Sequence, residues 1–491
     1  MPSEPEAWTS PNLRRRPLLL PAAIFLVFAG YLLGWGFQGY MPYDAEEYWR
    51  LAGLFYQDGH FSLFHYRSET RGYLFPLLLF GPKAVAHLLG LRPVYMAALL
   101  GAGCAAGLFG WLGPALYQAV SGEPRVPTVR RVAFAALGFL FWRGHFNFAL
   151  SDFPALTLLL ASLLLLARGP GRLGWVGAGL CFAAAANIRP VYSICLPGLV
   201  LLAALPRRPA GGWGVATGLF GLGAALILGP QLLLNLRQYH RPTPLVIAKI
   251  DGLGVKDLYL AQLWWGITTQ KTEGRLGKEY PRDLVLYADP GGERVLAAEQ
   301  LPTEKIGPPR LTSYGQYLAL VGRHPAAFAA IYARHLFNGL DVQHPTPYVA
   351  QVWRPGRLLA WANYTLWFAA LLLVWRGRRP GLGRRPAVVV GTLLLPCLAA
   401  LPLVVECRFL LPLHLLAYGA VCFGWPATSA RRPAGPLVGA YLIFVLGCGW
   451  QSARTYATLE FREPAARTAT RAGQPAPLKK RRPSAGVAAA G

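Results

Sequence analysis

Charged residues are scarce in this 491-residue chain, making up only 14% of it, and acidic residues are the scarcer kind, with 22 Asp and Glu against 48 Lys and Arg. A soluble protein usually carries about 25% charged residues. The composition therefore excludes an ordinary soluble enzyme. Hydrophobic residues make up 54%, and long apolar runs recur from one end to the other, so we expect a polytopic membrane protein.

Several patterns that mark other function classes are also missing. The seven cysteines have neither metal-ligand spacing nor a disulfide-framework pattern. The sequence has no internal repeat and no glycine-rich phosphate loop. A net charge of +26 on a soluble protein would favour a nucleic-acid partner. Here the basic residues cluster between apolar runs, so we expect them to set membrane topology, and we expect no nucleic-acid partner.

Eleven apolar runs are long enough, or nearly long enough, to cross a bilayer as helices. The first follows a group of three arginines and has no small-residue cleavage site, so we expect an uncleaved span. The runs lie near residues 17–37, 94–119, 131–148, 152–168, 173–188, 190–206, 213–236, 357–375, 386–405, 408–426 and 434–452.

A twelfth apolar run, at 73–91, contains Pro76, Pro82, Lys83 and His87. If the N-terminus is cytoplasmic and this run does not cross, every basic cluster between spans falls on one side, as the positive-inside rule requires. We therefore interpret 73–91 as interfacial or re-entrant. The clusters are Arg14–Arg16, Arg125 with Arg130 and Arg131, Arg168 with Arg172, Arg207 with Arg208, the arginines of 376–385, and Arg431 with Arg432.

The expected fold is an all-α polytopic membrane protein with about eleven transmembrane helices and two external segments. A cytoplasmic segment, 1–16, precedes the N-terminal transmembrane core. The other expected divisions are the core at 17–236 with an external loop at 38–93, an external α-rich subdomain at 237–356, C-terminal transmembrane helices at 357–452, and a basic, disordered tail at 453–491.

Charged residues recur in the segments expected outside the membrane, directly beside apolar runs. Such residues are costly near a bilayer and are usually kept for function or pairing. Guanidinium groups bind phosphate well, and a carboxylate can accept a proton from a hydroxyl or amine. The pattern predicts one outer-face site for a lipid-linked phosphate that carries a sugar. Its charged residues are Asp44, Glu46, Glu47, Asp58, Arg71, Asp152, Arg189, Glu406 and Arg408.

Each of these residues also has a purely structural interpretation. Glu46 and Glu47 fit the solvated face of a surface helix, and Asp58 precedes Gly59 as a turn residue would. Asp152 is well placed to cap a helix N-terminus. Arg189 can pair with a carboxylate or snorkel, Glu406 can pair with Arg408, and His65, His145 and His335 fit hydrogen bonding better than metal binding.

The opening of the first external loop resembles that of the GT-C glycosyltransferases, including protein O-mannosyltransferases and bacterial aminoarabinose transferases. Asp44, Tyr48 and Ala52 form D-x-x-x-Y-x-x-x-A, followed by Asp58-Gly59. The family carries an acidic pair here, and Ala45 stands where its second acid often is, with Glu46 or Glu47 as substitutes. The later segments ETRGYLFPLLLF, SDFPAL and ECRFLLPLHLL are similar to further family patterns.

The resemblance implies an inverting transfer of a sugar from a polyprenyl-phosphate donor to a glycan, lipid or protein acceptor on the outer face. Asp44 would be the base or would orient the acceptor, assisted by Asp152 and Glu47. Arg189 and Arg408 would bind the lipid phosphate. Further candidate substrate-binding residues are Glu406, Tyr48, Arg71 and Lys83. Some GT-C enzymes use a divalent cation, for which Asp44 and Asp152 would be the ligands.

Two other functions fit the same residues. A polyprenyl-linked lipid flippase would also need buried charges and a cationic cavity, although its charges should lie at mid-span depth. A glycan ligase or polymerase of the same fold would use a similar donor with a different acceptor. In each case we expect a multi-pass protein of a bacterial inner membrane, with its site on the external or periplasmic face.

Overall fold

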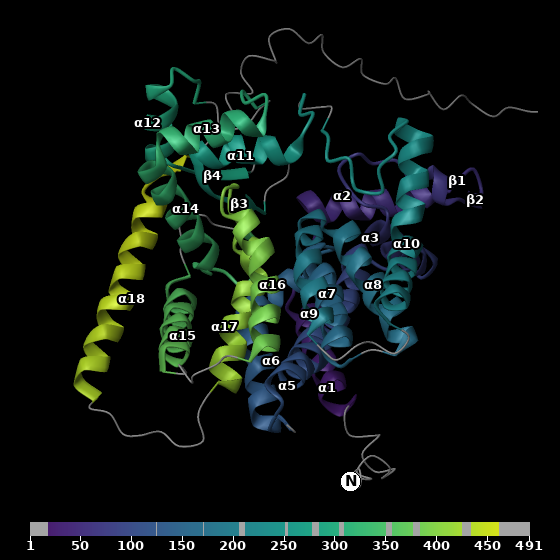
Figure 1. Cartoon of the computed structure of the whole chain (residues 1–491), viewed down its shortest axis with the longest axis horizontal. Coiled ribbons are helices and arrows are strands. Elements are labelled where there is room, and N and C mark those ends of the chain that lie inside the picture. Colours follow the sequence, from purple (N-terminus) through teal and green to yellow (C-terminus); the bar gives the residue numbers. More distant parts are fainter. Residues whose placement is uncertain are drawn as a thin grey trace, which may run out of the picture.

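The structure is a computed structural model, and most of its described residues are helical. Figure 1 shows a set of side-by-side helices with a second layer of helices and strands across one end. The expected segment 1–16 and everything beyond Glu460 lie outside the described residues. The residues that the structure describes are 18–123, 125–169, 171–205, 212–250, 254–276, 284–303, 309–349, 356–376, 383–424 and 434–460.

The first half of the chain forms a compact group of helices joined mostly by short connections. Short connections make neighbours antiparallel, and this places the starts and ends of successive helices alternately at the two ends of the group. One member is a single long helix whose middle turn is a π-helix. The elements are α1 (Leu19–Gly34), the continuous α4–η5–α5 (Pro93–Ala105, Ala106–Leu112 and Gly113–Ser121), α6 (Thr128–Trp142), η6 (Arg143–Asn147), α7 (Asp152–Ala167), α8 (Arg172–Ile188), η7 (Pro190–Cys195), α9 (Leu196–Ala204) and α10 (Gly212–Tyr239).

Helices α8 and α10 pack unusually closely. A Cβ atom added at Gly179 of α8 would collide with the carbonyl oxygen of Phe220, and one added at Gly223 of α10 would collide with that of Val176. Small residues let helix backbones approach in this way in membrane proteins, where dispersion contacts replace the hydrophobic driving force.

The second half contributes four more helices, beside the first group in Figure 1. Helix α15 packs against both α17 and α18. The hydroxyl groups of Thr365 on α15 and Tyr441 on α18 lie 2.8 Å apart. The elements are α15 (Arg357–Arg376), α16 (Arg384–Ala400), η9 (Cys407–Leu410), α17 (Leu411–Phe423) and α18 (Ala434–Tyr456).

Four helices in the described part of the chain are long and apolar enough to cross a membrane: Pro93–Ser121, Gly212–Tyr239, Arg357–Arg376 and Gly435–Tyr456. Multi-pass membrane character is therefore supported, but eleven spans are not shown. The other apolar helices have only 10–17 residues, and a perpendicular crossing needs about 20.

The first loop forms α2, a small hairpin and α3. The two-residue turn of the hairpin is Asp58-Gly59, with φ of 52° and 80°. Positive φ at both positions is typical of the tight turn that matches strand twist. The interpretation of Asp58 as a turn residue is confirmed. The elements are α2 (Tyr43–Ala52), η3 (Gly53–Phe55), β1 (Tyr56–Gln57), β2 (His60–Phe61), η4 (Leu63–His65) and α3 (Leu74–Leu88).

Helix α3 begins and ends near the same end of the helical group. At its start, the Leu74 amide donates to Asn187 Oδ1 at the end of α8, at 3.0 Å. Just beyond its end, Arg92 donates to the carbonyl of Gln38, which follows α1, at 3.3 Å. Because successive helices alternate in direction, α1 and α8 both finish at this end of the group. Helix α3 therefore packs beside α2 and does not run the length of the group.

The segment 237–356 is not purely helical, and the all-α expectation is wrong. Four strands form a sheet in the order β5-β3-β4-β6, with β3 and β4 antiparallel and β5 parallel to β3. Short strands flanked by amphipathic helices leave a weak periodic signal, which explains the error. The elements are α11 (Leu258–Thr268), β3 (Thr269–Arg275), β4 (Leu284–Ala288), α12 (Pro290–Ala298), α13 (Tyr314–Arg323), α14 (Pro325–Leu340) and β5 (Tyr348–Val349).

The last strand of this sheet comes from the C-terminal part of the chain. Strand β6 (Leu459–Glu460) follows α18 and pairs with β4, with Tyr287 opposite Leu459. Helix α18 continues to Tyr456, past the expected boundary at residue 452, and the residues after it complete the sheet.

Candidate active site

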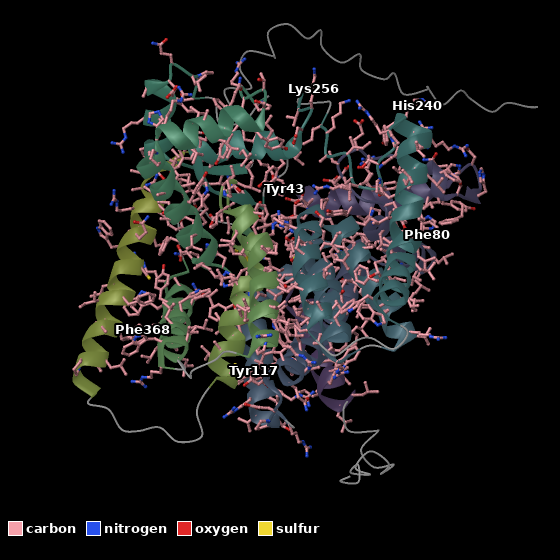
Figure 2. The ribbon with its side chains drawn as sticks, in the orientation of Figure 1. Tyr43, Phe80, Tyr117, His240, Lys256 and Phe368 are labelled. Carbon is pink, nitrogen blue, oxygen red and sulfur yellow. The ribbon has the colours of Figure 1, made fainter. Side chains whose placement is uncertain are left out.

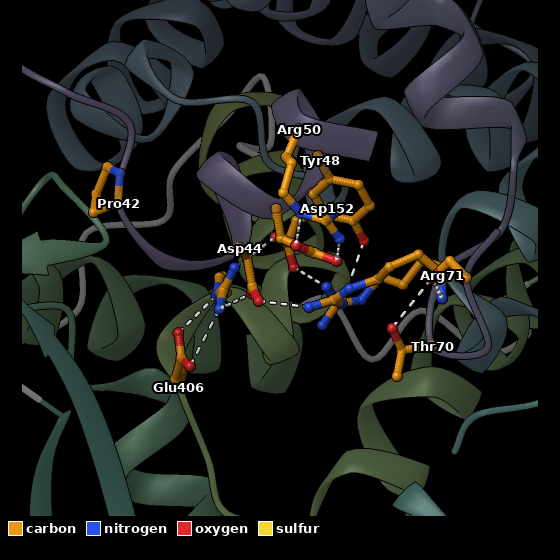
Figure 3. Close-up of polar contacts among 12 residues, drawn as sticks. Pro42, Asp44, Tyr48, Arg50, Thr70, Arg71, Asp152 and Glu406 are labelled. Atoms are coloured by element: carbon orange, nitrogen blue, oxygen red, sulfur yellow. Dashed lines mark hydrogen bonds and ion pairs between the residues drawn. The ribbon is translucent and has the colours of Figure 1, made fainter. Parts of the chain in front are cut away.

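Arg408 lies at the centre of a network of ion pairs that joins distant parts of the chain (Figure 3). Its Nε donates to Glu406 Oε2 at 2.6 Å, and its Nη1 donates to Asp152 Oδ2 at 3.3 Å. Its Nη2 donates to Asp44 Oδ2 at 3.0 Å and to Glu406 Oε1 at 3.2 Å. One guanidinium group thus holds three carboxylates.

Two further arginines complete the network at its two ends. Arg71 Nη2 donates to Asp44 Oδ1 at 2.6 Å, and Arg189 Nη1 donates to Asp152 Oδ1. The site therefore contains three guanidinium groups and three carboxylates. Because Asp44 and Asp152 bond to the same guanidinium, they belong to one site, as the sequence predicted.

Contacts with the sheet fix the start of α2 and hence the place of Asp44. Tyr43, with φ of 50°, donates from its hydroxyl to the carbonyl of Arg275 at 2.8 Å. Its ring stacks on Tyr348 of β5 at 5.3 Å, and the Tyr348 hydroxyl donates to the carbonyl of Pro42 at 3.3 Å. Figure 2 shows Tyr43 where α2 meets the sheet-bearing layer, far from Tyr117 at the opposite end of the helices.

Buried polar side chains that sequence reasoning missed hold the segment with Arg71. The Tyr66 hydroxyl donates to the Arg71 carbonyl at 2.9 Å. Gln231 Oε1, on α10, accepts from the Tyr73 amide at 3.2 Å and from Asn187 Nδ2 at 2.9 Å. The signal that could have found Asn187 and Gln231 is an amide side chain inside an apolar run, which needs a polar partner when buried.

Tyr48 provides an aromatic face for Arg71. The Arg71 guanidinium carbon lies 4.9 Å from the Tyr48 ring centroid, and Nη1 lies 3.4 Å from the Tyr48 hydroxyl. Tyr48 is buried, so this cation–π contact keeps the guanidinium turned toward Asp44.

Asp152 pairs with two arginines and does not cap its helix. Ser151 occupies the N-cap position of α7, and both carboxylate oxygens of Asp152 accept from arginines. The ring of Phe409 lies between the two cations, 5.0 Å from the Arg189 guanidinium carbon and 5.7 Å from that of Arg408. Capping therefore does not account for this residue.

Glu47 and Lys83 are candidate residues that lie outside the network. Glu47 accepts from Nε and Nη2 of Arg50 at 2.9 and 2.8 Å, on an exposed face of α2. An acid and a base three residues apart on a helix are neighbours, which explains this pairing. Lys83, on α3, donates to the carbonyl of Trp49 near the end of α2 at 2.8 Å.

The two less buried carboxylates differ in their proton affinity. Partial burial would raise the pKa of Asp44, but the charges of Arg71, Arg408 and Arg189 outweigh it and hold the pKa well below its usual range. Burial raises the pKa of Glu406, and Arg408 only partly offsets this. Asp44 is thus firmly ionised in this state, whereas Glu406 holds a proton more readily.

The side chains of this network differ strongly in exposure. Those of Asp44 and Arg71 are 31% and 28% exposed, whereas those of Asp152 and Arg408 are 2% and 9% exposed. A ligand would therefore meet Asp44 and Arg71 first. Asp152 and Arg408 form the buried floor.

The residues present do not fit a divalent-cation site. Each of the four carboxylate oxygens of Asp44 and Asp152 already accepts from an arginine. A cation bound there would lie against three guanidinium groups and would have to displace them. Among the described residues, no group of three or more His, Cys, Asp or Glu side chains could hold a metal ion.

The structure thus brings together most of the residues that the sequence selected, from segments spread over almost the whole chain. The members are Asp44, Tyr48, Arg71, Asp152, Arg189, Glu406 and Arg408. No protein-family model, curated protein or solved structure matches this chain.

Proposed function

We propose that this protein is a membrane glycosyltransferase of GT-C type, which moves a sugar from a polyprenyl-phosphate donor to an acceptor at the outer membrane face. The observation that carries the proposal is the ion-pair network centred on Arg408. It combines guanidinium groups able to bind a lipid phosphate with a partly exposed carboxylate beside them.

The proposed membrane arrangement has eleven crossings, with the network at the outer ends of the helices. The ends opposite to the network gather arginines. Arg130, at the start of α6, donates to the carbonyl of Phe423 at the end of α17, at 3.1 Å. Tyr117 of α5 donates to the same carbonyl at 3.2 Å. The short connections between helices carry more arginines at this end than at the network end, which favours a cytoplasmic placement of this end.

Every charge in the substrate-free network is compensated, so an arriving phosphate must compete for the arginines. Arg71 is the most accessible cation of the network. A phosphate that pairs with Arg71 and Arg408 would withdraw both from Asp44. Loss of this stabilisation raises the pKa of a carboxylate. Donor binding would thereby convert a tightly paired, weakly basic Asp44 into a better proton acceptor.

The proposed reaction is a single displacement at the anomeric carbon of the donor. An acceptor hydroxyl or amine attacks this carbon while the bond to the phosphate oxygen breaks, which inverts the configuration. The acceptor proton passes to Asp44. The leaving polyprenyl phosphate keeps the bond electrons, and Arg408 and Arg71 stabilise its added negative charge. Asp152 and Arg189 hold Arg408 in place.

The test is transfer by the purified full-length protein in lipid nanodiscs, with radiolabelled polyprenyl-phosphate sugars and cell-envelope extracts as the acceptor source. Wild-type protein should transfer label to an acceptor. Asp44→Asn should lower the rate at least about a hundredfold, the range seen on loss of a general base. Asp58→Asn is the matched control, because it makes the same chemical change in the same loop and Asn tolerates positive φ.

Full transfer by Asp44→Asn would overturn the assignment of Asp44. A wild-type protein that moves the intact donor across a vesicle bilayer, and transfers no sugar, would instead establish a flippase.

A further inference from the structure

A polar pocket of about 410 Å³, counting its open mouth, adjoins the ion-pair network. Arg408 and Glu406 belong to both, whereas the remaining pocket residues are Cys407 and residues of η6, β3 and the segment 341–349. The residues used in the argument are His145, Lys271, Glu273, Asp341, Gln343 and His344.

Gln343 presents an unpaired carbonyl oxygen in this pocket. Its Nε2 donates to Asp341 Oδ1 and Oδ2 at 3.0 and 2.9 Å and to Ser452 Oγ at 2.6 Å. A carboxylate only accepts, so the amide orientation is fixed and Oε1 is the other atom. Oε1 is buried and has no hydrogen-bond partner among the described residues, and Gln343 is only 5% exposed.

His145 presents a second unpaired acceptor. Its Nδ1 lies 3.1 Å from the carbonyl of Pro345, which only accepts, so Nδ1 carries the proton. In the neutral ring, Nε2 is then an acceptor, and it is buried without a described partner. Burial at 1% exposure and the nearby Arg408 both disfavour the charged ring.

His344 adds a third buried ring nitrogen, Nε2, that also lacks a partner in the described part of the chain. Burial lowers the pKa of His344, so the ring is neutral at pH 7. Unpaired buried polar groups are costly and rare. Three in one small pocket point to a ligand or waters that complete them.

Each charged residue of the pocket has close ion-pair or hydrogen-bond partners. Lys271 Nζ lies 2.7 Å from Glu273 Oε1, and Arg408 holds Glu406. Asp341 accepts from Gln343, and also from Ser452 and Tyr364 at 2.7 Å each. The groups left over are neutral, and two of the three are acceptors. A suitable ligand is therefore uncharged and donates hydrogen bonds.

We infer that this pocket binds an uncharged, hydroxyl-rich group, whose hydroxyls donate to Gln343 Oε1 and His145 Nε2 and meet His344. The inference rests on the proposed function for the origin of this group, which is the sugar of the donor or of the acceptor. In either case the shared Arg408 brings the sugar next to the network.

The test measures binding to the full-length protein in nanodiscs with three kinds of probe. Farnesyl phosphate carries the phosphate without a sugar, farnesyl-phosphoryl hexoses and pentoses carry both, and methyl glycosides carry the sugar alone. His344→Phe and His145→Phe each remove a pocket nitrogen while keeping an aromatic ring. Each should weaken binding of a sugar-bearing probe about three- to tenfold, and leave binding of farnesyl phosphate unchanged.

His335→Phe is the matched control. His335 has the same pattern as His145, one ring nitrogen against a backbone carbonyl, Leu401 at 2.6 Å, and the other buried without a described partner. It does not line the pocket. The control should not change sugar binding. His344 forms no hydrogen bond with another described residue, so His344→Phe keeps the test usable should His145→Phe fail to fold.

The three kinds of probe distinguish a donor sugar from an acceptor sugar. They also separate the inference about the pocket from the proposed function. Weakened binding of farnesyl-phosphoryl sugars alone assigns the pocket to the donor sugar, and weakened binding of methyl glycosides alone assigns it to the acceptor. Unchanged binding of every sugar probe in both pocket variants would overturn the inference and leave water as the occupant. That result would not affect the proposed function, which depends on transfer by wild type and its loss in Asp44→Asn.

Discussion

Arg408 and Asp44, separated by 364 positions in the sequence, are joined by a hydrogen bond of 3.0 Å between Nη2 and Oδ2. The bond connects α2, in the first loop, to the segment before α17. The first and second halves of the chain, which both contribute charged residues to the site, thus meet at the Arg408 guanidinium. This relationship makes the stability of the site and its chemistry depend on the same residue.

Arg408→Ala should destabilise the protein by about 3–5 kcal/mol, because it removes one partner of buried carboxylates. Asp44 and Asp152 keep Arg71 and Arg189, whereas Glu406 loses the cation that holds both its oxygens. The measurement is the free energy of unfolding in denaturant for the purified protein.

The double variant Arg408→Ala with Glu406→Gln should recover part of this loss, since it no longer buries an uncompensated Glu406 charge. Purely additive effects in this cycle would contradict the described pairing.

Arg71→Met should lower the stability of the protein near neutral pH and make that stability fall less on acidification. The folded pKa of Asp44 lies below its ordinary value of 3.8. A lowered carboxylate pKa contributes stability that is present above the unfolded value and is lost as the pH falls through the folded value. Without the Arg71 charge the folded pKa rises toward the unfolded value, so less stability is lost and the loss is complete at a higher pH. Unfolding free energies measured from about pH 3 to pH 7 test this, with Arg50→Met as the exposed-arginine control. Equal acid profiles for Arg71→Met and wild type would refute it.

Single cysteines should report the proposed topology. Gln57→Cys, in the exposed hairpin, should react with a membrane-impermeant maleimide added outside intact cells. Gly171→Cys, at the exposed start of α8, should react only after permeabilisation. The seven native cysteines are free, so the experiment needs a background in which they are replaced by serine or alanine. Labelling of Gly171→Cys in intact cells would rule out the eleven-crossing arrangement.

Removal of divalent cations should leave the substrate-free protein unchanged. The oxygens of Asp44 and Asp152 are occupied by arginines, so neither a chelator nor added Mg²⁺ or Mn²⁺ should move the melting temperature. A cation that bound the folded state would stabilise it by about 2.7 kcal/mol at a hundred times its dissociation constant. Such a shift in wild type, and its absence in Asp44→Asn, would show that the carboxylates do bind a metal.

The core of the site could be found from sequence because charge beside an apolar run is a strong signal. Asp44, Asp152, Arg189 and Arg408 each stand at the edge of such a run, and all four meet. Glu47 has the same local signal but pairs with Arg50, a competitor that only the helix geometry shows. Sequence alone therefore did not show that Glu47 pairs with the neighbouring Arg50 and not with the network.

Other features depend on contacts between distant segments and left no local trace. The sheet is closed by β5 and β6, strands of two residues each, whose pairing with β3 and β4 could not be seen in either segment alone. Likewise, the orientation of the Gln343 amide in the pocket is fixed by contacts with Asp341 and with the distant Ser452. The shorter apolar helices also fell within the runs predicted from sequence, but periodicity does not settle whether 10–17 residues cross a membrane.

Strand β6 has a consequence for how the protein is made. The sheet needs residues 459 and 460, and the fixed amide of Gln343 needs Ser452 of α18. A ribosome adds Ser452 more than a hundred positions after Asp341 and Gln343. The layer that carries the sheet must therefore wait, unfinished, until α18 has been made, so the proposed substrate pocket is complete only after this late helix is in place.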